Sequence, residues 1–385
     1  MVEALVNPEL LRWARERVAM TVGMLADRLK IPADKVIAWE EGQARPSFVQ
    51  AERLAALAHI PFGVLFLASP PDETLPIPDL RTHSGMPRDR FSPDFLDFLR
   101  DTMFKRDWYR AFLESRGAEL LSFVGSLELA TPVDSAAIQI RSALGIDPDL
   151  ASAGNWETHL NELFRKCEDL GIWIMRTGYV GSNTRRTLST SDFRGFAIAD
   201  EIVPLIVING RDAKAAQAFT LAHELAHIWF GRSGVSDPFL RHSDGGDLDI
   251  ERVCNAVAAE ILVPRVNFDM AWIDTGGLEK NAQALSQRFK VSRVVIARRA
   301  LDLGKISLSA YQSFFDSEQR GWASASDGGG DYYKIVPVKN GRRFTEAVLG
   351  SAMSGNLLLR DAGSLLHMKP ATIPKLYARQ TQEVR

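Results

Sequence analysis

Apolar residues recur at the spacing of an α-helix along most of the chain, whereas three short segments near its middle have the pattern of β-strands. Helices are predicted over residues 10–18, 22–29, 33–40, 50–59, 94–116, 135–144, 156–170, 219–230 and 248–264, with helix, turn, helix over 282–301 and again over 357–376. Strands are predicted over residues 171–175, 192–199 and 203–209. The last strand has an unbroken apolar core, which is typical of a strand buried on both faces. The pattern therefore predicts a mostly helical α+β fold with a small sheet.

Two segments that are rich in structure-breaking residues divide the chain. Residues 69–79 are proline-dense, which predicts an extended spacer, and residues 323–330 are rich in Gly and Ser, which predicts a flexible joint. We therefore predict five segments: an N-terminal domain (1–68), a linker (69–91), a central domain with a helical N-terminal extension (92–322), a second linker (323–330) and a C-terminal helical segment (331–385).

The helix predicted over 219–230 contains the motif H-E-x-x-H. At helical spacing His223 and His227 lie one turn apart on one face, so both imidazoles can reach a single metal ion. Zinc accepts neutral imidazole and leaves one position to water, and Glu224 would lie close enough to take a proton from that water. The alternative is a pair of buried structural histidines. With seven histidines in 385 residues, a chance motif is expected in on the order of one chain in a hundred.

A third metal ligand is predicted on the next helix. Glu251 and Glu260 are nine positions apart and point to nearly opposite faces, so only one of them can face the metal, and we choose Glu251. Asn255 lies one turn later, where its amide could hold the second nitrogen of a ligating histidine. Cys254 is an alternative thiolate ligand, although a buried thiol is the simpler interpretation. The stretch between the two helices, residues 232–247, is predicted to be a surface loop, in which His242 could stabilise negative charge or simply be exposed.

The order of motifs around this helix resembles the ImmA/IrrE-type metallopeptidases. The resemblance covers residues 155–303 and rests on a G-F strand, a P-x-I-x-I-N strand, F-T-L-A-H-E-L-A-H and E-x-x-x-N-x-x-A-A-E-I-L-V-P. It implies a gluzincin-like zinc site with His223, His227 and Glu251 as ligands and Glu224 as general base. The implied function is limited proteolysis of a regulatory protein such as a DNA-bound repressor, or an antitoxin role beside a toxin partner.

Residues 21–47 are similar to the Xre-type helix-turn-helix domains, in which the third helix enters the major groove of DNA. The candidate contacts to nucleic acid are Asp34, Lys35 and Arg45. Residues 1–60 carry eight Lys or Arg against eight Asp or Glu, so counterion release would contribute little to affinity. The alternatives are therefore DNA binding through residues 1–68, and a docking or dimerisation module that keeps the fold without the reading surface. Either alternative is compatible with a homodimer.

Composition limits the remaining possibilities. A 46% hydrophobic content is ordinary for a globular protein, and no apolar run approaches the length of about 18 residues that a membrane span needs. Two cysteines and no leader pattern favour a cytoplasmic protein without membrane contact. The net charge of -2 hides a basic C-terminal segment, because residues 331–385 carry nine Lys or Arg against four Asp or Glu. Arg185, Arg186 and Arg194 could meet acidic substrate residues, although a solvated loop is the simpler interpretation.

Overall fold

The computed structural model describes residues 2–72, 77–78, 91–146, 156–236, 247–320 and 332–383. The predicted joint at 323–330, His242 and most of the proline-dense linker lie outside these residues. The chain divides into two compact units, one formed by residues 1–75 with 91–96 and the other by residues 76–90 with 97–385. Helices dominate, and a single small sheet is present in the described chain, which agrees with the predicted α+β class.

The first unit is a bundle of short helices: α1 (Pro8–Arg17), α2 (Val22–Leu29), α3 (Ala33–Glu40), α4 (Phe48–Leu57) and the 3₁₀ turn η1 (Phe62–Phe66). The side chains of Asn7, Thr21 and Ser47 cap three of these helices at their N-termini. The core is built from residues such as Leu10, Leu25, Trp39 and Leu54. The bounds of all four α-helices agree with the apolar pattern to within two residues, and α1 and α4 each begin two residues before the predicted start.

The second unit contains a four-stranded sheet with the order β1-β3-β2-β4. Its strands are β1 (Trp173–Thr177), β2 (Gly195–Ile198), β3 (Leu205–Asn209) and β4 (Gly234–Ser236). β1 is parallel to β3, and β2 is antiparallel to both β3 and β4. All five residues of β3 are buried, as its apolar sequence predicts. β4 corrects the prediction of a loop over 232–247: its three residues complete the free side of β2, which a sequence of mixed polarity does not reveal.

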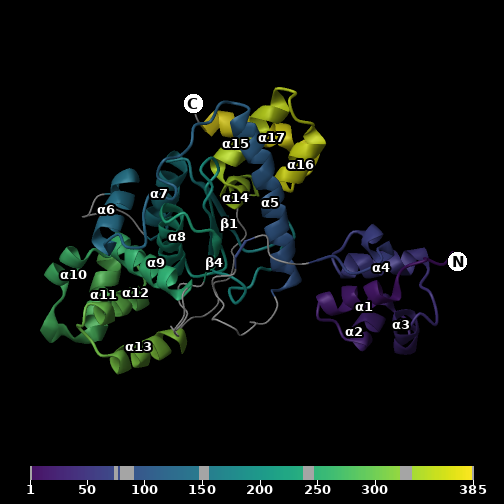
Figure 1. Cartoon of the computed structure of the whole chain (residues 1–385), viewed down its shortest axis with the longest axis horizontal. Coiled ribbons are helices and arrows are strands. Elements are labelled where there is room, and N and C mark those ends of the chain that lie inside the picture. The colour runs from purple at the N-terminus through teal and green to yellow at the C-terminus, as the bar shows by residue number, and fades with distance from the viewer. Residues whose placement is uncertain are drawn as a thin grey trace. The chain divides into compact units, whose positions relative to one another are not determined.

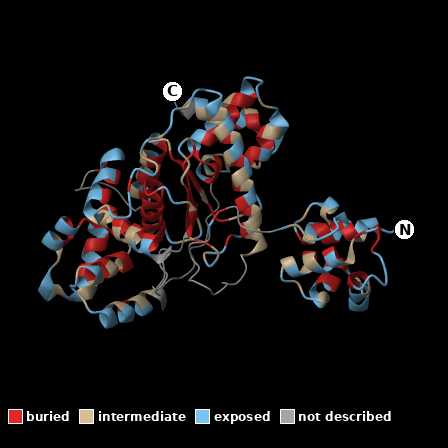
Figure 2. Cartoon of the chain, in the orientation of Figure 1, coloured by how far each residue is buried: buried red, intermediate tan, exposed pale blue. Residues whose placement is uncertain are grey.

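The sheet lies between two long helices (Figure 1). α8 (Lys214–Trp229) packs against β2 and β3, and α5 (Pro93–Glu114) covers the opposite face, where Phe98 stacks on Phe193 with ring centroids 5.9 Å apart. α9 (Asp247–Leu262) packs along α8, while α6 (Val133–Ala143) and α7 (Trp156–Asp169) cover the outer side. From Ala216 to Trp229 every α8 residue is buried, and Figure 2 shows the helix enclosed along this length. An enclosed helix must carry an apolar sequence on all sides, so its few polar residues need a special role.

The remaining helices form two groups. After α9 come α10 (Arg265–Ala271), η2 (Asp274–Gly276), α11 (Gly277–Phe289), α12 (Arg293–Asp302) and α13 (Leu308–Arg320). The C-terminal group contains α14 (Tyr332–Asn340), α15 (Arg342–Met353), α16 (Leu359–Leu366), η3 (Pro370–Thr372) and α17 (Ile373–Glu383). Among the described helices, none combines the length and apolar character that a membrane crossing requires.

The C-terminal group packs on the outer strand β1. The Trp173 indole N–H donates a hydrogen bond to the Asn340 carbonyl at 2.6 Å, and the Trp173 ring stacks on Phe344 at 4.7 Å. Gly341 permits this approach, because a Cβ atom there would lie 2.5 Å from the Trp173 ring, and its φ of +84° favours glycine. Residues 341–344 therefore attach the C-terminal helices to the edge of the sheet.

Candidate metal centre

α8 and α9 bring the three predicted metal ligands together. The Nε2 atoms of His223 and His227 are 3.0 Å apart. Glu251, from α9, places one carboxylate oxygen 3.3 Å from the His223 Nε2 and the other 3.1 Å from the His227 Nε2. All three side chains are buried, and their ligand atoms lie within 4.8 Å of one another. Helical spacing accounts for the two histidines, whereas the packing of α9 on α8 supplies the carboxylate.

The geometry of these atoms fits a divalent metal ion. A tetrahedral zinc shell with bonds of about 2.0–2.2 Å has edges of about 3.3–3.6 Å between its ligand atoms. The three observed distances, 3.0, 3.1 and 3.3 Å, are close to those edges. Two facing imidazole nitrogens would otherwise need a proton between them, and the Glu251 Oε1 atom is buried without a hydrogen-bond partner in the described structure. A cation at the centre of the triangle satisfies all of these lone pairs.

Asn255 orients one of the two imidazoles. Its side-chain oxygen lies 3.0 Å from the Nδ1 atom of His223, so Nδ1 carries the hydrogen and donates it. The Nε2 atom of His223 then keeps its lone pair and points toward His227 and Glu251, which is the tautomer that a metal requires. The Nδ1 atom of His227 has no corresponding partner among the described residues.

The electrostatics of the triad follow from burial and mutual attraction. Burial opposes the charged form of Glu251, but the two imidazoles outweigh it and lower the pKa of Glu251 to about 2. Burial also works against protonated His223, and the neighbouring Glu251 reverses this effect and raises the pKa of His223. For His227 burial prevails, and its pKa is lowered. The carboxylate is therefore ionised, and the pair of imidazoles cannot easily carry two protons.

Glu224 lies directly after His223 on α8 and is completely buried, with no exposed surface. Its carboxylate packs against the backbone of β2 at Gly195. A Cβ atom added to Gly195 would lie 2.8 Å from the Glu224 Oε1 atom and 2.5 Å from the Thr220 methyl group. Only glycine therefore leaves room for this carboxylate between the strand and the helix.

The alternative ligands point elsewhere. Glu260 pairs with the buried Arg299, and its other oxygen accepts the backbone N–H of Arg265 at 2.9 Å. Cys254 is a buried thiol outside the ligand cluster. Burial raises the pKa of Cys254 well above its usual value, and the charges of Glu251 and Glu224 raise it further. Neither residue lies where a metal bound by the two histidines would reach it.

Two of the three arginines considered as contacts for an acidic substrate are engaged within the chain. Arg186 donates to Asp97 at 2.6 Å, and Arg194 donates to Asp212 at 2.7 Å. Their guanidinium groups therefore stabilise the fold around the sheet and are not available to an acidic substrate. Arg185 is exposed and lines a separate cavity beside α16.

The candidate nucleic-acid contacts of the first unit lie on or near α3. Asp34, Lys35 and Arg45 are exposed, and the Lys35 ammonium lies 5.8 Å from the centre of the Trp39 ring. The surface between them is apolar in part, since Ile37 is 41% exposed. Their role in DNA binding stays a prediction.

Gly195 and Thr220 are site residues that sequence reasoning did not identify. The G-F strand pattern contained the signal for Gly195, because an isolated glycine within a strand often marks a close approach of another group. Thr220 carries no comparable signal. Its position four residues before Glu224 places it on the same face of α8, but only the packing of β2 gives that face a neighbour.

Comparison with known families agrees with the position of this site. The model of the IrrE N-terminal-like domain, which defines a peptidase family, matches residues 167–301. A second model, for a domain of unknown function (DUF8813), matches residues 340–379. Among curated proteins none matches the chain. The matched segment contains the sheet and all three candidate ligands, so this part of the chain is similar to the IrrE N-terminal-like domain and supports a function of the metallopeptidase type.

Proposed function

We propose that this protein is a zinc-dependent endopeptidase that cuts a regulatory protein, such as a DNA-bound repressor, at a limited number of sites. The observation that carries the proposal is the buried triangle of His223, His227 and Glu251 with the carboxylate of Glu224 next to it in sequence. Two neutral nitrogens and one carboxylate are the donor set of a catalytic zinc site that keeps one position open. A purely structural zinc site would use a fourth protein ligand.

The chain's own residues have separable roles in this proposal. When bound, zinc would lower the pKa of a water molecule and polarise the scissile carbonyl. Glu224 would then accept the proton of a water molecule on its carboxylate and deliver it to the leaving amine. Asn255 holds His223 in the tautomer that binds metal, and Gly195 keeps the space in which Glu224 lies. Burial of the site excludes bulk water and strengthens each of these interactions.

β4 is the outer strand of the sheet, next to β2, and β2 is the strand that touches Glu224. The backbone N–H of Val235 in β4 donates to the Pro78 carbonyl at 2.9 Å, so an extended peptide could add to this edge only by displacing residue 78.

The decisive experiment compares the wild-type chain with Glu224→Gln and His223→Ala. We expect Glu224→Gln to keep stoichiometric zinc and to lose about 10²–10⁴-fold in turnover, because it removes the base but no ligand. His223→Ala should lose both the metal and the activity. Glu201→Gln, at an exposed glutamate, serves as the matched control and should behave like wild type.

Substrates can be found with the same variants. The natural partner is co-purified with Glu224→Gln, exposed to wild-type protein, and examined by mass spectrometry for new termini. New termini that appear with wild type and Glu201→Gln, and not with Glu224→Gln, would identify the substrate. Equal cleavage by Glu224→Gln would refute the assigned base.

The second candidate function is a DNA-binding regulator, or the antitoxin of a toxin pair, in which the zinc fold is a scaffold or sensor. The observation that favours it is the separate N-terminal helical unit, in which α3 exposes Asp34 and Lys35. A gel shift with operator DNA at two salt concentrations tests it, with Lys35→Ala as the variant. Salt-sensitive binding that Lys35→Ala weakens would support DNA recognition. Unchanged weak binding would leave the unit as a protein-docking or dimerisation module.

A further inference from the structure

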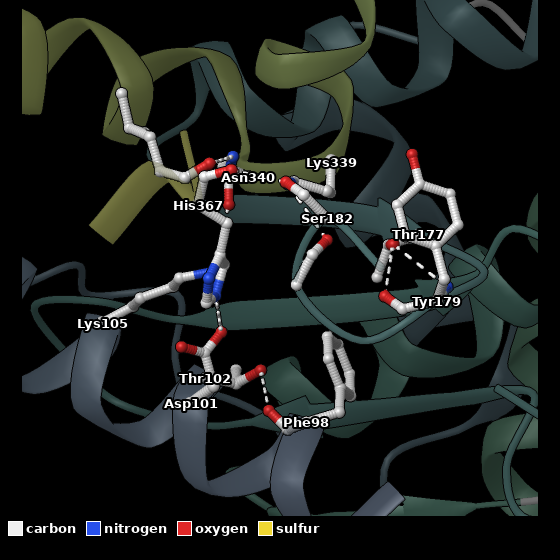
Figure 3. Close-up of polar contacts among 12 residues, drawn as sticks. Phe98, Asp101, Thr102, Lys105, Thr177, Tyr179, Ser182, Lys339, Asn340 and His367 are labelled. Atoms are coloured by element: carbon white, nitrogen blue, oxygen red, sulfur yellow. Dashed lines mark hydrogen bonds and ion pairs between the residues drawn. The ribbon is translucent and has the colours of Figure 1, made fainter. Parts of the chain in front are cut away.

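A cluster of buried charges joins α5, the turn at residues 181–182 and the C-terminal helices (Figure 3). Lys105 and Lys339 are both buried, with exposed fractions of 2% and 5%. The Lys105 ammonium contacts Asp101 at 2.8 Å and the Asn340 side-chain oxygen at 3.1 Å. Lys339 donates to the Gly181 carbonyl and to the Ser182 hydroxyl, each at 3.1 Å, and no carboxylate of the described chain lies within ion-pair distance of it. Of these two buried cations, only Lys105 is paired with a carboxylate.

His367 links this cluster to the surface. Its Nε2 atom donates to Asp101 at 2.8 Å, and its backbone carbonyl accepts the Ser182 hydroxyl hydrogen. Burial raises the pKa of Asp101, but the contacts with His367 and Lys105 lower it overall, so the carboxylate is ionised and already shared. Burial and, to a smaller extent, the charge of the nearby Lys105 lower the pKa of Lys339 to about 7, although the charge of Asp101 opposes this shift. The positive charge of Lys339 is therefore poorly compensated in this arrangement.

An open surface hollow of about 920 Å³ is lined in part by Ser182 and His367. One wall is formed by residues 182–185, and the other by Arg360, Gly363, Ser364 and residues 367–370 of the C-terminal helices. We call it the α16 cavity. Arg185, Arg360 and Lys369 supply positive charge from both walls, and none of the described residues that line it is acidic. Asp361 does not line the cavity, but its carboxylate accepts a hydrogen bond from Arg360 at 3.1 Å. It therefore offsets the charge of Arg360 and not the charges of Arg185 and Lys369.

The uncharged groups of the cavity also favour an anion. The Asn183 side-chain oxygen accepts the Arg185 backbone N–H at 3.1 Å, which leaves the amide hydrogens of Asn183 as donors. Thr184 adds a hydroxyl group to the lining. The backbone carbonyls at the C-terminal end of α16 would repel an anion. Two of them already accept hydrogen bonds, since the backbone N–H groups of His367 and Met368 donate to the carbonyls of Ser364 and Gly363. The donors therefore prevail over the acceptors.

We propose that the α16 cavity binds a small molecule that carries two or more phosphate groups, such as a nucleoside diphosphate or triphosphate. Arginine, lysine and short polar donors with no lining carboxylate are the usual surroundings of phosphate in proteins. Three cationic residues line one hollow whose volume lies in the range of small-ligand sites, about 300–1,000 Å³. A nucleic acid would instead need cations spread along an extended surface.

Calorimetric titration of the full chain tests the proposal, with ATP, inorganic triphosphate and inorganic phosphate as probes and a short single-stranded DNA as the competing class. We expect saturable one-to-one binding of ATP or triphosphate, and much weaker binding of single phosphate. Arg185→Gln/Lys369→Gln should weaken triphosphate binding about a hundredfold, since each charge-assisted contact contributes about tenfold. Arg360→Gln, tested alone, should cost about tenfold.

The matched control removes the same charge elsewhere. Lys280→Gln/Lys334→Gln replaces two exposed lysines that do not line the cavity, and it should bind triphosphate as the wild type does. Equal losses in the two double variants, or no binding of any phosphate probe, would overturn the proposal. The proposal would also be overturned if the DNA bound more tightly than triphosphate and Arg185→Gln/Lys369→Gln weakened that binding. This result would assign the cavity to nucleic acid.

Polyphosphates chelate metals, so the candidate metal centre is tested separately. The titration is repeated with His223→Ala and with Glu251→Gln, and thermal unfolding confirms that each variant is folded. Binding of triphosphate should persist in both, because neither residue lines the α16 cavity. Loss of binding in these variants alone would place the phosphates at the metal and refute the α16 site.

Discussion

Replacement of Gly195 by alanine is the most direct test of how β2 meets the metal helix. The added Cβ atom would lie 2.5 Å from the Thr220 methyl carbon and 2.8 Å from the Glu224 Oε1 atom. Carbon atoms in contact are normally about 3.5–4.0 Å apart, so β2 and α8 must separate locally by about 1 Å. Thr220 is fully buried, so neighbouring atoms limit the rotation of its side chain away from the new Cβ atom.

Overpacking of this kind costs about 1–3 kcal/mol in the free energy of unfolding. For a unit of this size that cost corresponds to a fall in Tm of about 2–12 °C. The assay is thermal unfolding followed by circular dichroism, with zinc content measured on the same samples. We expect lower stability and nearly normal zinc content, because the Cβ atom meets Glu224 and none of the three ligands. Turnover should fall with the displacement of Glu224.

Two further variants make this prediction specific. Thr220→Ser removes the methyl group that meets the new Cβ atom, so Gly195→Ala/Thr220→Ser should recover part of the lost stability. Gly350→Ala is the matched control, because nothing lies within 4 Å of its added Cβ atom on α15, and it should be neutral or stabilising by up to about 1 kcal/mol. A Gly195→Ala chain as stable as wild type, or no recovery with Thr220→Ser, would refute the reasoning.

Three further predictions concern single residues. Asn255→Ala should lower zinc affinity about 10–100-fold, because His223 loses the acceptor that sets its tautomer. Competition with a chelator measures this affinity, and an unchanged value would contradict the role of Asn255. Lys339 has a pKa of about 7 when folded and an ordinary value of 10.5, so the unfolded chain binds the proton more tightly and stability should rise with pH between about 7 and 10. Lys339→Met should flatten that rise in denaturant titrations at the two ends of this range, and an unchanged slope would show that the lysine is not buried as described. Gly341→Ala should destabilise the attachment to Trp173 by a few kcal/mol, seen as faster proteolysis of the C-terminal helices, whereas unchanged protection would contradict the close contact.

Local patterns predicted the helices and the strands because these elements depend on the spacing of apolar residues. The helix over 219–230 was predicted from its motif, and the structure extends it from Lys214 to Trp229. β4 escaped prediction, since three residues of mixed polarity form a strand only when a partner such as β2 is present. The helices α10, α13, α14 and α15 were also not predicted individually. Pro337 interrupts the helical pattern of α14, and α15 buries residues against β1, a partner that is distant in sequence.

The candidate ligands show the same division between local and tertiary causes. Helical periodicity alone places His223 and His227 on one face, and it places Glu251 and Glu260 on opposite faces of the next helix. It cannot show which of those faces meets α8, because that choice depends on how the apolar surfaces of the two helices pack.

The sequence by itself determined the donor chemistry, the helix that bears two of the donors and the basic character of the C-terminal segment. Only the tertiary structure decided that Glu251 closes the triangle, that Gly195 makes room for Glu224, and that Lys339 and His367 lie beneath a cationic cavity. The physical reason is range: periodicity acts over one or two helical turns, whereas these contacts join residues that are distant in sequence through packing that no local pattern encodes.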